Sequence, residues 1–117
     1  MKIKLIDVNE EHWNFILSLR NAFFEHSFYE QKHAISKDEH YEYMKKQTTN
    51  PNFHQWIATS DGLPIGYMRI LDHDINIMVD KKFQNKGVGT TMLKLVEEKA
   101  KKLGLKKLEA RVLTENQ

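Results

Sequence analysis

The chain has 117 residues, which suits one domain with a single hydrophobic core. It contains no cysteine, which excludes disulfides, a thiolate nucleophile and cysteine-ligated metal sites. A net charge of +2 is too small to indicate a nucleic-acid surface, and no apolar run reaches the roughly 18 residues of a membrane span. We therefore expect one cytoplasmic domain over residues 1–117, without a signal peptide, nucleic acid or membrane as partner.

The first half of the chain predicts one strand and two helices. Residues 2–8 alternate apolar and polar side chains, as in a half-buried edge strand. Asn9 is a suitable helix N-cap, and the apolar residues after it recur at helical spacing over about 10–24. The segment 26–35 has no clear period and is predicted to be a loop. Ser36 and Glu39 have the spacing of a capping box, which predicts a second helix over about 37–48.

The second half predicts three strands, a helix and a last strand. The strands are expected at 53–59, 64–71 and 74–80, joined by a turn at 60–62 and a tight connection at 72–73. A helix should run from about Gly87 to Leu103 and bury Leu103, before a strand at 106–113. The order β-α-α-β-β-β-α-β predicts a mixed α/β fold around a mostly antiparallel sheet.

The organising motif is Gln84-Asn85-Lys86-Gly87-Val88-Gly89, between a strand and a helix. Glycines at 87 and 89 let the backbone bend and approach a ligand, and the first N–H groups of the helix attract an anion. Lys86 adds a full positive charge. The alternative is a strand–helix turn that binds nothing.

Two other phosphate loops are excluded by spacing. A Walker A loop places lysine after its last glycine, whereas Lys86 precedes Gly87. The dinucleotide fingerprint needs a third glycine where this chain has Met92.

The remaining pattern, Gln-x-x-Gly-x-Gly, resembles the pyrophosphate motif (Arg/Gln-x-x-Gly-x-Gly/Ala) of the GNAT superfamily, and the resemblance extends over nearly the whole chain. It implies an N-acetyltransferase with acetyl-CoA as cosubstrate and a small-molecule amine as acceptor. The thioester arm would lie in a V between the strand 74–80 and the strand 106–113. The implied cofactor-binding residues are Met78, Val79, Gln84, Asn85, Lys86, Gly87, Val88, Gly89, Thr90 and Asn116.

Shorter motifs look like those of a subgroup that acetylates nucleotide-linked amino sugars. They are Leu-Arg-Asn at 19–21, Ile35-Ser36 with His40, and the segment 62–70. The resemblance points to substrate-binding residues Arg20, Asn21, His40, Tyr67 and Arg69. The alternative for each arginine is an ordinary surface role.

Amide formation needs a base for the amine and donors for the oxyanion. His73 is the candidate base, flanked by Asp72 and Asp74; the alternative is a polar hairpin turn. A backbone N–H of Met78 or Val79 is the candidate oxyanion donor. The other histidines have no spacing with acids that makes a metal site, so no metal is predicted.

The chain departs from the family pattern after Asn116. Relatives usually continue with a helix carrying a tyrosine that protonates the thiolate, and then with closing strands. We therefore expect a second chain to cover the last strand, as a homodimer or strand-exchanged oligomer. The competing function is a shortened CoA-binding or protein-interaction module without turnover. Nucleic-acid binding through the lysines near residues 99–107 ranks last.

Overall fold

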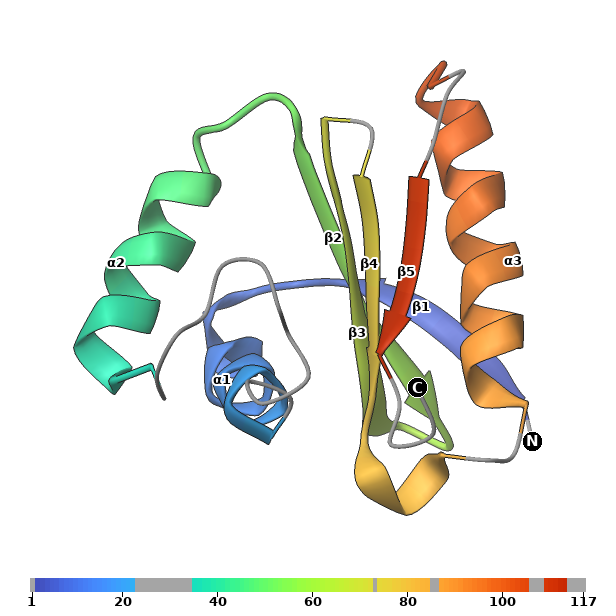
Figure 1. Ribbon diagram of the computed structural model, residues 1–117, viewed down its shortest axis with the longest axis horizontal. Coiled ribbons are helices and arrows are strands. Elements are labelled where there is room, and N and C mark those ends of the chain that lie inside the picture. The colour runs from blue at the N-terminus through green and yellow to red at the C-terminus, as the bar shows by residue number, and fades with distance from the viewer. Residues whose placement is uncertain (1, 23–34, 73, 85–86, 106–108, 114–117) are drawn as a thin grey trace.

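The computed structural model describes residues 2–22, 35–72, 74–84 and 87–105, together with the backbone of 109–113 (Figure 1). Within these ranges the predicted order of elements and the mixed α/β fold are confirmed. Short 3-10 turns at Glu10–His12 and Lys81–Phe83 precede the first and third helices. The elements are β1 (Ile3–Asp7), α1 (Trp13–Ala22), α2 (Lys37–Gln47), β2 (Phe53–Ser60), β3 (Leu63–Leu71), β4 (Asp74–Val79), α3 (Val88–Lys102) and β5 (Glu109–Leu113).

The strands form one sheet in sequence order, β1-β2-β3-β4-β5. The first four strands pair antiparallel, and β5 pairs parallel to β4 after the α3 crossover. Asp61 and Gly62 have φ angles of 51° and 79° and join β2 to β3, which is the backbone of a type I′ hairpin turn. Leu71 pairs with Asp74, so β3 and β4 are joined by the tight connection that the sequence predicted.

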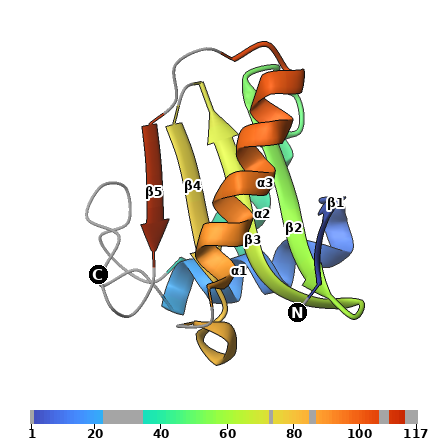
Figure 2. The same cartoon turned by 90° about the vertical axis from the view of Figure 1, so that its right-hand side faces the viewer.

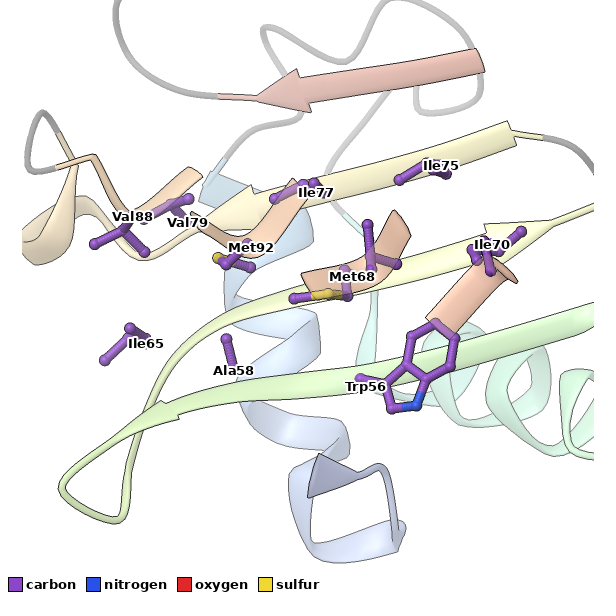
Figure 3. Close-up of a cluster of buried hydrophobic side chains, with 12 residues drawn as sticks. Trp56, Ala58, Ile65, Met68, Ile70, Ile75, Ile77, Val79, Val88 and Met92 are labelled. Atoms are coloured by element: carbon purple, nitrogen blue, oxygen red, sulfur yellow. The ribbon is translucent and has the colours of Figure 1, made fainter. Parts of the chain in front are cut away.

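Helices cover both faces of the sheet, with α1 and α2 on one side and α3 on the other (Figures 1 and 2). The buried row of α3 has a spacing of four residues and packs on the inward side chains of β2, β3 and β4. Figure 3 shows Met92 and Val88 of α3 among Ala58, Ile65 and Val79 of the strands. The row is Val88, Met92, Val96 and Ala100.

The predicted burial of Leu103 is wrong, because this side chain is 43% exposed. The regular helix ends at Lys102, and Leu103 is its C-cap residue. Ala100, which continues the four-residue row, is fully buried instead. The apolar row therefore ends one turn earlier than expected.

The first helix begins later than predicted, because its first turn is a 3-10 turn. Asn9 caps this turn by accepting from the N–H of Glu11 at 3.0 Å, and its own N–H donates to Nδ1 of His12 at 3.0 Å. Regular α-helix starts only at Trp13. The Ser36 cap of α2 is as predicted, with its Oγ accepting from the N–H of Glu39 at 3.2 Å. The predicted loop at 26–35 is described only at Ile35.

Candidate active site

The chain reverses tightly between β4 and α3, and Asp80 organises the reversal. Its N–H donates to the carbonyl of Ile65 in β3 at 2.8 Å. Its carboxylate accepts from the N–H of Lys82 at 3.0 Å, and its carbonyl accepts from Phe83 at 2.8 Å. These bonds close the 3-10 turn, so the chain returns directly to the end of β4.

Gln84 follows this turn and is buried, with 7% of its surface exposed. Its side-chain Nε2 donates to the backbone carbonyl of Val79 at 3.0 Å. The first residue of the predicted motif therefore bonds to the last residue of β4. A buried polar side chain needs such a partner, since an unsatisfied amide in the core is costly.

Gly87 is the N-cap of α3 and adopts the left-handed conformation, with φ 75° and ψ 7°. A Cβ added at this position would meet no atom of the described residues within 4 Å, so among them the backbone conformation, and not crowding, requires glycine. The N–H and Oγ1 of Thr91 both bond to the Gly87 carbonyl at 3.1 Å. Buried Val88 anchors the first turn, while Gly87 and Thr90 are exposed and Gly89 is half-buried.

The first turn of α3 therefore lies at the surface with its N–H groups directed away from the helix. These groups have no acceptor within the helix, and the helix dipole adds partial positive charge. No atom in the described part of the chain crowds the space beside Gly87, which lets an anion approach the backbone closely. This geometry suits a phosphate or pyrophosphate group.

Met78 and Val79 direct their backbone groups to opposite sides of β4. Because Asp80 donates to Ile65 and the bonds alternate along an antiparallel ladder, Met78 faces β3 and Val79 faces β5. The β4–β5 pairs run without interruption from Asp74↔Glu109 to Met78↔Leu113. The expected V is therefore closed over these five pairs, and Val79 is the β4 residue just past them.

Arg20 and His40 join α1 to α2. Arg20 Nη1 lies 3.2 Å from Nδ1 of His40, and Nε2 of His40 lies 2.8 Å from the carbonyl of Trp13. Arginine can only donate and a carbonyl can only accept, so the neutral imidazole carries its proton on Nε2. Burial lowers the pKa of His40 below 6.5. The Trp13 hydrogen bond opposes this shift, and the Arg20 charge adds a smaller lowering effect.

The side chains of Arg20 and Asn21 make further contacts to α2 and to Ile35, which precedes it. The Arg20 guanidinium carbon lies 4.5 Å from the centre of the Tyr43 ring, a cation–π contact within α1 and α2. Asn21 donates to the Ile35 carbonyl at 3.0 Å and accepts from the Ile35 N–H at 2.7 Å. The structure therefore gives Arg20 and His40 contacts between α1 and α2, and gives Asn21 two bonds to the segment just before α2, which explain these residues without a ligand.

Tyr67 and Arg69 lie on β3, on the sheet face that α1 and α2 cover. Tyr67 is 2% exposed, packs in the cluster with Met78 and Trp13, and donates its hydroxyl to Oε1 of Gln55 at 2.9 Å. Burial raises the pKa of Tyr67 well above its usual value, so the phenol stays neutral. Arg69 pairs across the sheet with Gln55 in β2 and Asn76 in β4.

Asn76 and Gln55 are polar residues of this face that the sequence reasoning missed. Cross-strand partners point to the same face, so Asn76, Arg69 and Gln55 form one polar row beside Tyr67. Oδ1 of Asn76 is buried and has no hydrogen-bond partner among the described residues. The signal was the alternation of Asp74 and Asn76 with Ile75 and Ile77, which places both polar residues on one face.

Four predicted site residues, His73, Asn85, Lys86 and Asn116, lie outside the described residues. No three His, Asp or Glu side chains in the described part of the chain lie close enough together to hold a metal ion. Within the same ranges, every helix is too short or too polar to span a lipid bilayer.

Comparison with known proteins places this geometry in context. A model of the acetyltransferase (GNAT) family matches residues 13–117. A domain from Methanocaldococcus jannaschii DSM 2661 superposes with a TM-score of 0.75 at 21% identity, over 98% of this chain and 80% of that one. An N-acetyltransferase from Staphylococcus aureus Mu50 superposes with a TM-score of 0.72 at 18% identity, over 94% of this chain and 73% of that one. Spermidine N-acetyltransferase from Vibrio cholerae, solved with CoA and spermine, has a TM-score of 0.70 at 16% identity, over 82% of this chain and 62% of that one. These likenesses show the fold.

Proposed function

Because the chain belongs to the acetyltransferase (GNAT) family, whose cosubstrate is acetyl-CoA, we propose that it transfers the acetyl group to a primary amine of a small molecule. The observation that carries the proposal is the left-handed Gly87 at the exposed N-terminus of α3. The residues fit the cosubstrate, since a pyrophosphate can meet backbone N–H groups there with no side chain of the described residues beside Gly87 in its path.

In this proposal the backbone from Gly87 to Thr90 holds the pyrophosphate. Lys86 and Asn85 add charge and hydrogen bonds beside it, and Asn116 contacts the same cosubstrate. The pantetheine arm runs from the start of α3 along the end of β4, where Val79 faces the β5 side. Met78 directs its backbone to β3, so Val79 is the better placed of the two as oxyanion donor.

The reaction needs the amine as a free base. Its lone pair forms a C–N bond with the thioester carbonyl carbon, the C–S bond breaks, and the amine proton passes to a base while CoA leaves as thiolate. His73, beside Asp74, is the proposed base. The sheet face that carries Tyr67, Arg69 and Asn76 is the proposed acceptor side, because its polar row adjoins Met78.

The acceptor is proposed to be polar, since the row offers the guanidinium of Arg69 and the side-chain amides of Asn76 and Gln55. An amino sugar linked to a nucleotide is one candidate, with Arg69 meeting its hydroxyls or phosphates. β5 ends the described strand order, so we also propose that a second copy of the chain pairs with this edge. Light scattering after size exclusion tests the dimer.

Turnover can be measured as free thiol without a contribution from the protein, because the chain has no cysteine, and a reaction without protein gives the uncatalysed rate. The protein is incubated with acetyl-CoA and each of four amines: spermidine, glucosamine, a nucleotide-linked amino sugar and a dipeptide. Release of thiol with one amine, and mass-spectrometric detection of its acetylated product, supports the proposal. Tight acetyl-CoA binding with no product from any amine would favour a binding module instead.

A further inference from the structure

We infer that Gln84 is a positioning residue for the thioester end of β4 and not a direct ligand of the pyrophosphate. The inference rests on the proposed function. It assigns the first position of the Gln84–Gly89 loop a task different from that of the glycines that follow. The task is to hold the Val79–Asp80 peptide group in one orientation.

The peptide group between Val79 and Asp80 is bonded on both sides. Its N–H donates to the Ile65 carbonyl at 2.8 Å, and its C=O accepts from Nε2 of Gln84 at 3.0 Å. The first bond comes from β3 and the second from the loop, so the peptide plane cannot rotate without breaking one of them. Such a two-sided arrangement fixes the direction of β4 where it leaves the sheet.

Gln84 is directed into the protein and not toward the exposed turn of α3. It is 7% exposed, whereas Gly87 and Thr90 are exposed at the surface. Its Nε2 atom is already committed to a buried carbonyl, and the polar groups of Val79 face the side of β4 where the thioester is proposed to lie. The glutamine thus connects the phosphate loop to the reacting end of the strand.

This arrangement makes a prediction about which kinetic constant Gln84 controls. Loss of the Gln84 bond leaves the N–H groups of α3 in place, so cosubstrate affinity should change little. The Val79–Asp80 peptide group is then held by the Ile65 bond alone, and a small misplacement near a reacting group slows the chemical step strongly. A pyrophosphate ligand would behave in the opposite way, since its loss weakens binding first.

The test compares Gln84→Met, which keeps the side-chain length and removes the donor, with Lys82→Met as a control. Lys82 is exposed in the same turn, and its backbone N–H alone serves the Asp80 cap. Each protein is assayed with acetyl-CoA and with S-acetyl-pantetheine, a donor that has no pyrophosphate. We expect Gln84→Met to lose about tenfold in kcat with either donor, while KM for acetyl-CoA changes less than about threefold.

If Gln84→Met raises KM for acetyl-CoA, leaves kcat unchanged and has no effect with S-acetyl-pantetheine, the inference is overturned, because Gln84 would then be a pyrophosphate ligand. Amide hydrogen exchange supplies a second readout that does not depend on turnover. Exchange at the Asp80 N–H should be at least about tenfold faster in Gln84→Met than in Lys82→Met. Equal exchange would also overturn it. If the unaltered chain acetylates nothing, the proposed function fails, and exchange still decides whether Gln84 holds the peptide.

Discussion

Arg20 of α1 donates to the Nδ1 atom of His40 of α2 across 3.2 Å, and this bond requires a neutral imidazole. The opposite ring nitrogen donates to the Trp13 carbonyl at 2.8 Å, so His40 links two points of α1 to α2. Protonation would place an N–H on Nδ1, directly against the guanidinium. The bond between the two helices is therefore sensitive to pH.

We predict that the chain loses stability as the pH falls below 6.5, the ordinary histidine value. Burial lowers the pKa of folded His40, so between the two values the unfolded state binds more protons than the folded state. Neutral His40 contributes its full stabilisation above pH 6.5, and this stabilisation declines as the pH falls toward the lowered pKa of the folded state. Melting temperature measured from pH 7.5 to 5 tests this.

The matched variant is His40→Gln, which does not titrate. Its melting temperature should depend less on pH over this range than that of the unaltered chain, although it is lower at pH 7.5. Parallel curves for the two proteins would show that His40 titrates as it does in the unfolded state.

Gly66 is expected to tolerate no side chain, because β3 and α3 approach closely there. A Cβ at this position would lie 2.7 Å from Cε of Met92 and 2.8 Å from the Met78 carbonyl oxygen. We predict that Gly66→Ala lowers the free energy of unfolding by about 1–3 kcal/mol, measured by urea denaturation.

A double-mutant cycle separates the two contacts. In a Met92→Ala background, Gly66→Ala should lower the free energy of unfolding by less, because the sulfur and Cε of Met92 are gone while the Met78 carbonyl oxygen stays. An unchanged cost in that background would assign the clash to the β4 backbone alone. A Gly66→Ala protein as stable as the original would contradict the packing of α3 on β3.

Tyr67→Phe removes the hydroxyl that donates to Gln55 at 2.9 Å. We expect a loss of about 1 kcal/mol at pH 7, the usual value of a hydrogen bond of this kind. Burial raises the pKa of folded Tyr67 above 10.0, so its contribution is complete below pH 10 and declines as the unfolded state ionises above it. The stability difference between the two proteins should therefore narrow, or reverse, when unfolding is measured above pH 10.

The order of elements could be predicted from the sequence because its signals are local. Period-two strands, the Ser36 cap and the Asp61-Gly62 turn each depend on neighbours in the chain, and each is observed. Gly87 was also correctly placed at the start of a helix. The exact end of each apolar row could not be predicted, because it depends on tertiary packing. The predicted burial of Leu103 was wrong for this reason.

Side-chain partners could not be predicted, because they are set by tertiary contacts. Gln84 was expected to hold a phosphate, and its bond to Val79 depends on how the Asp80 turn returns the chain to β4. Arg20 and His40 are 20 residues apart, and only the packing of α1 on α2 brings them together. The polar row with Asn76 required the strand register, which a single sequence leaves open.

The central claim is that the first turn of α3 binds the pyrophosphate of acetyl-CoA, and a matched pair of glycine variants tests it most directly. Gly87 and Gly104 flank the same helix, with φ angles of 75° and 78°, and no atom of the described residues lies within 4 Å of an added Cβ at either one. Alanine at either position bears the same backbone strain of about 1–2 kcal/mol. Only the methyl at Gly87 would lie where the anion approaches.

Acetyl-CoA is titrated calorimetrically into the unaltered chain, Gly87→Ala and Gly104→Ala. Equal melting temperatures of the two variants confirm that they bear equal backbone strain. We predict that Gly104→Ala binds within about twofold of the unaltered chain, whereas Gly87→Ala binds at least tenfold more weakly, about 1.4 kcal/mol. Equal affinity for the two variants, or no binding by the unaltered chain, would contradict a pyrophosphate site at the start of α3.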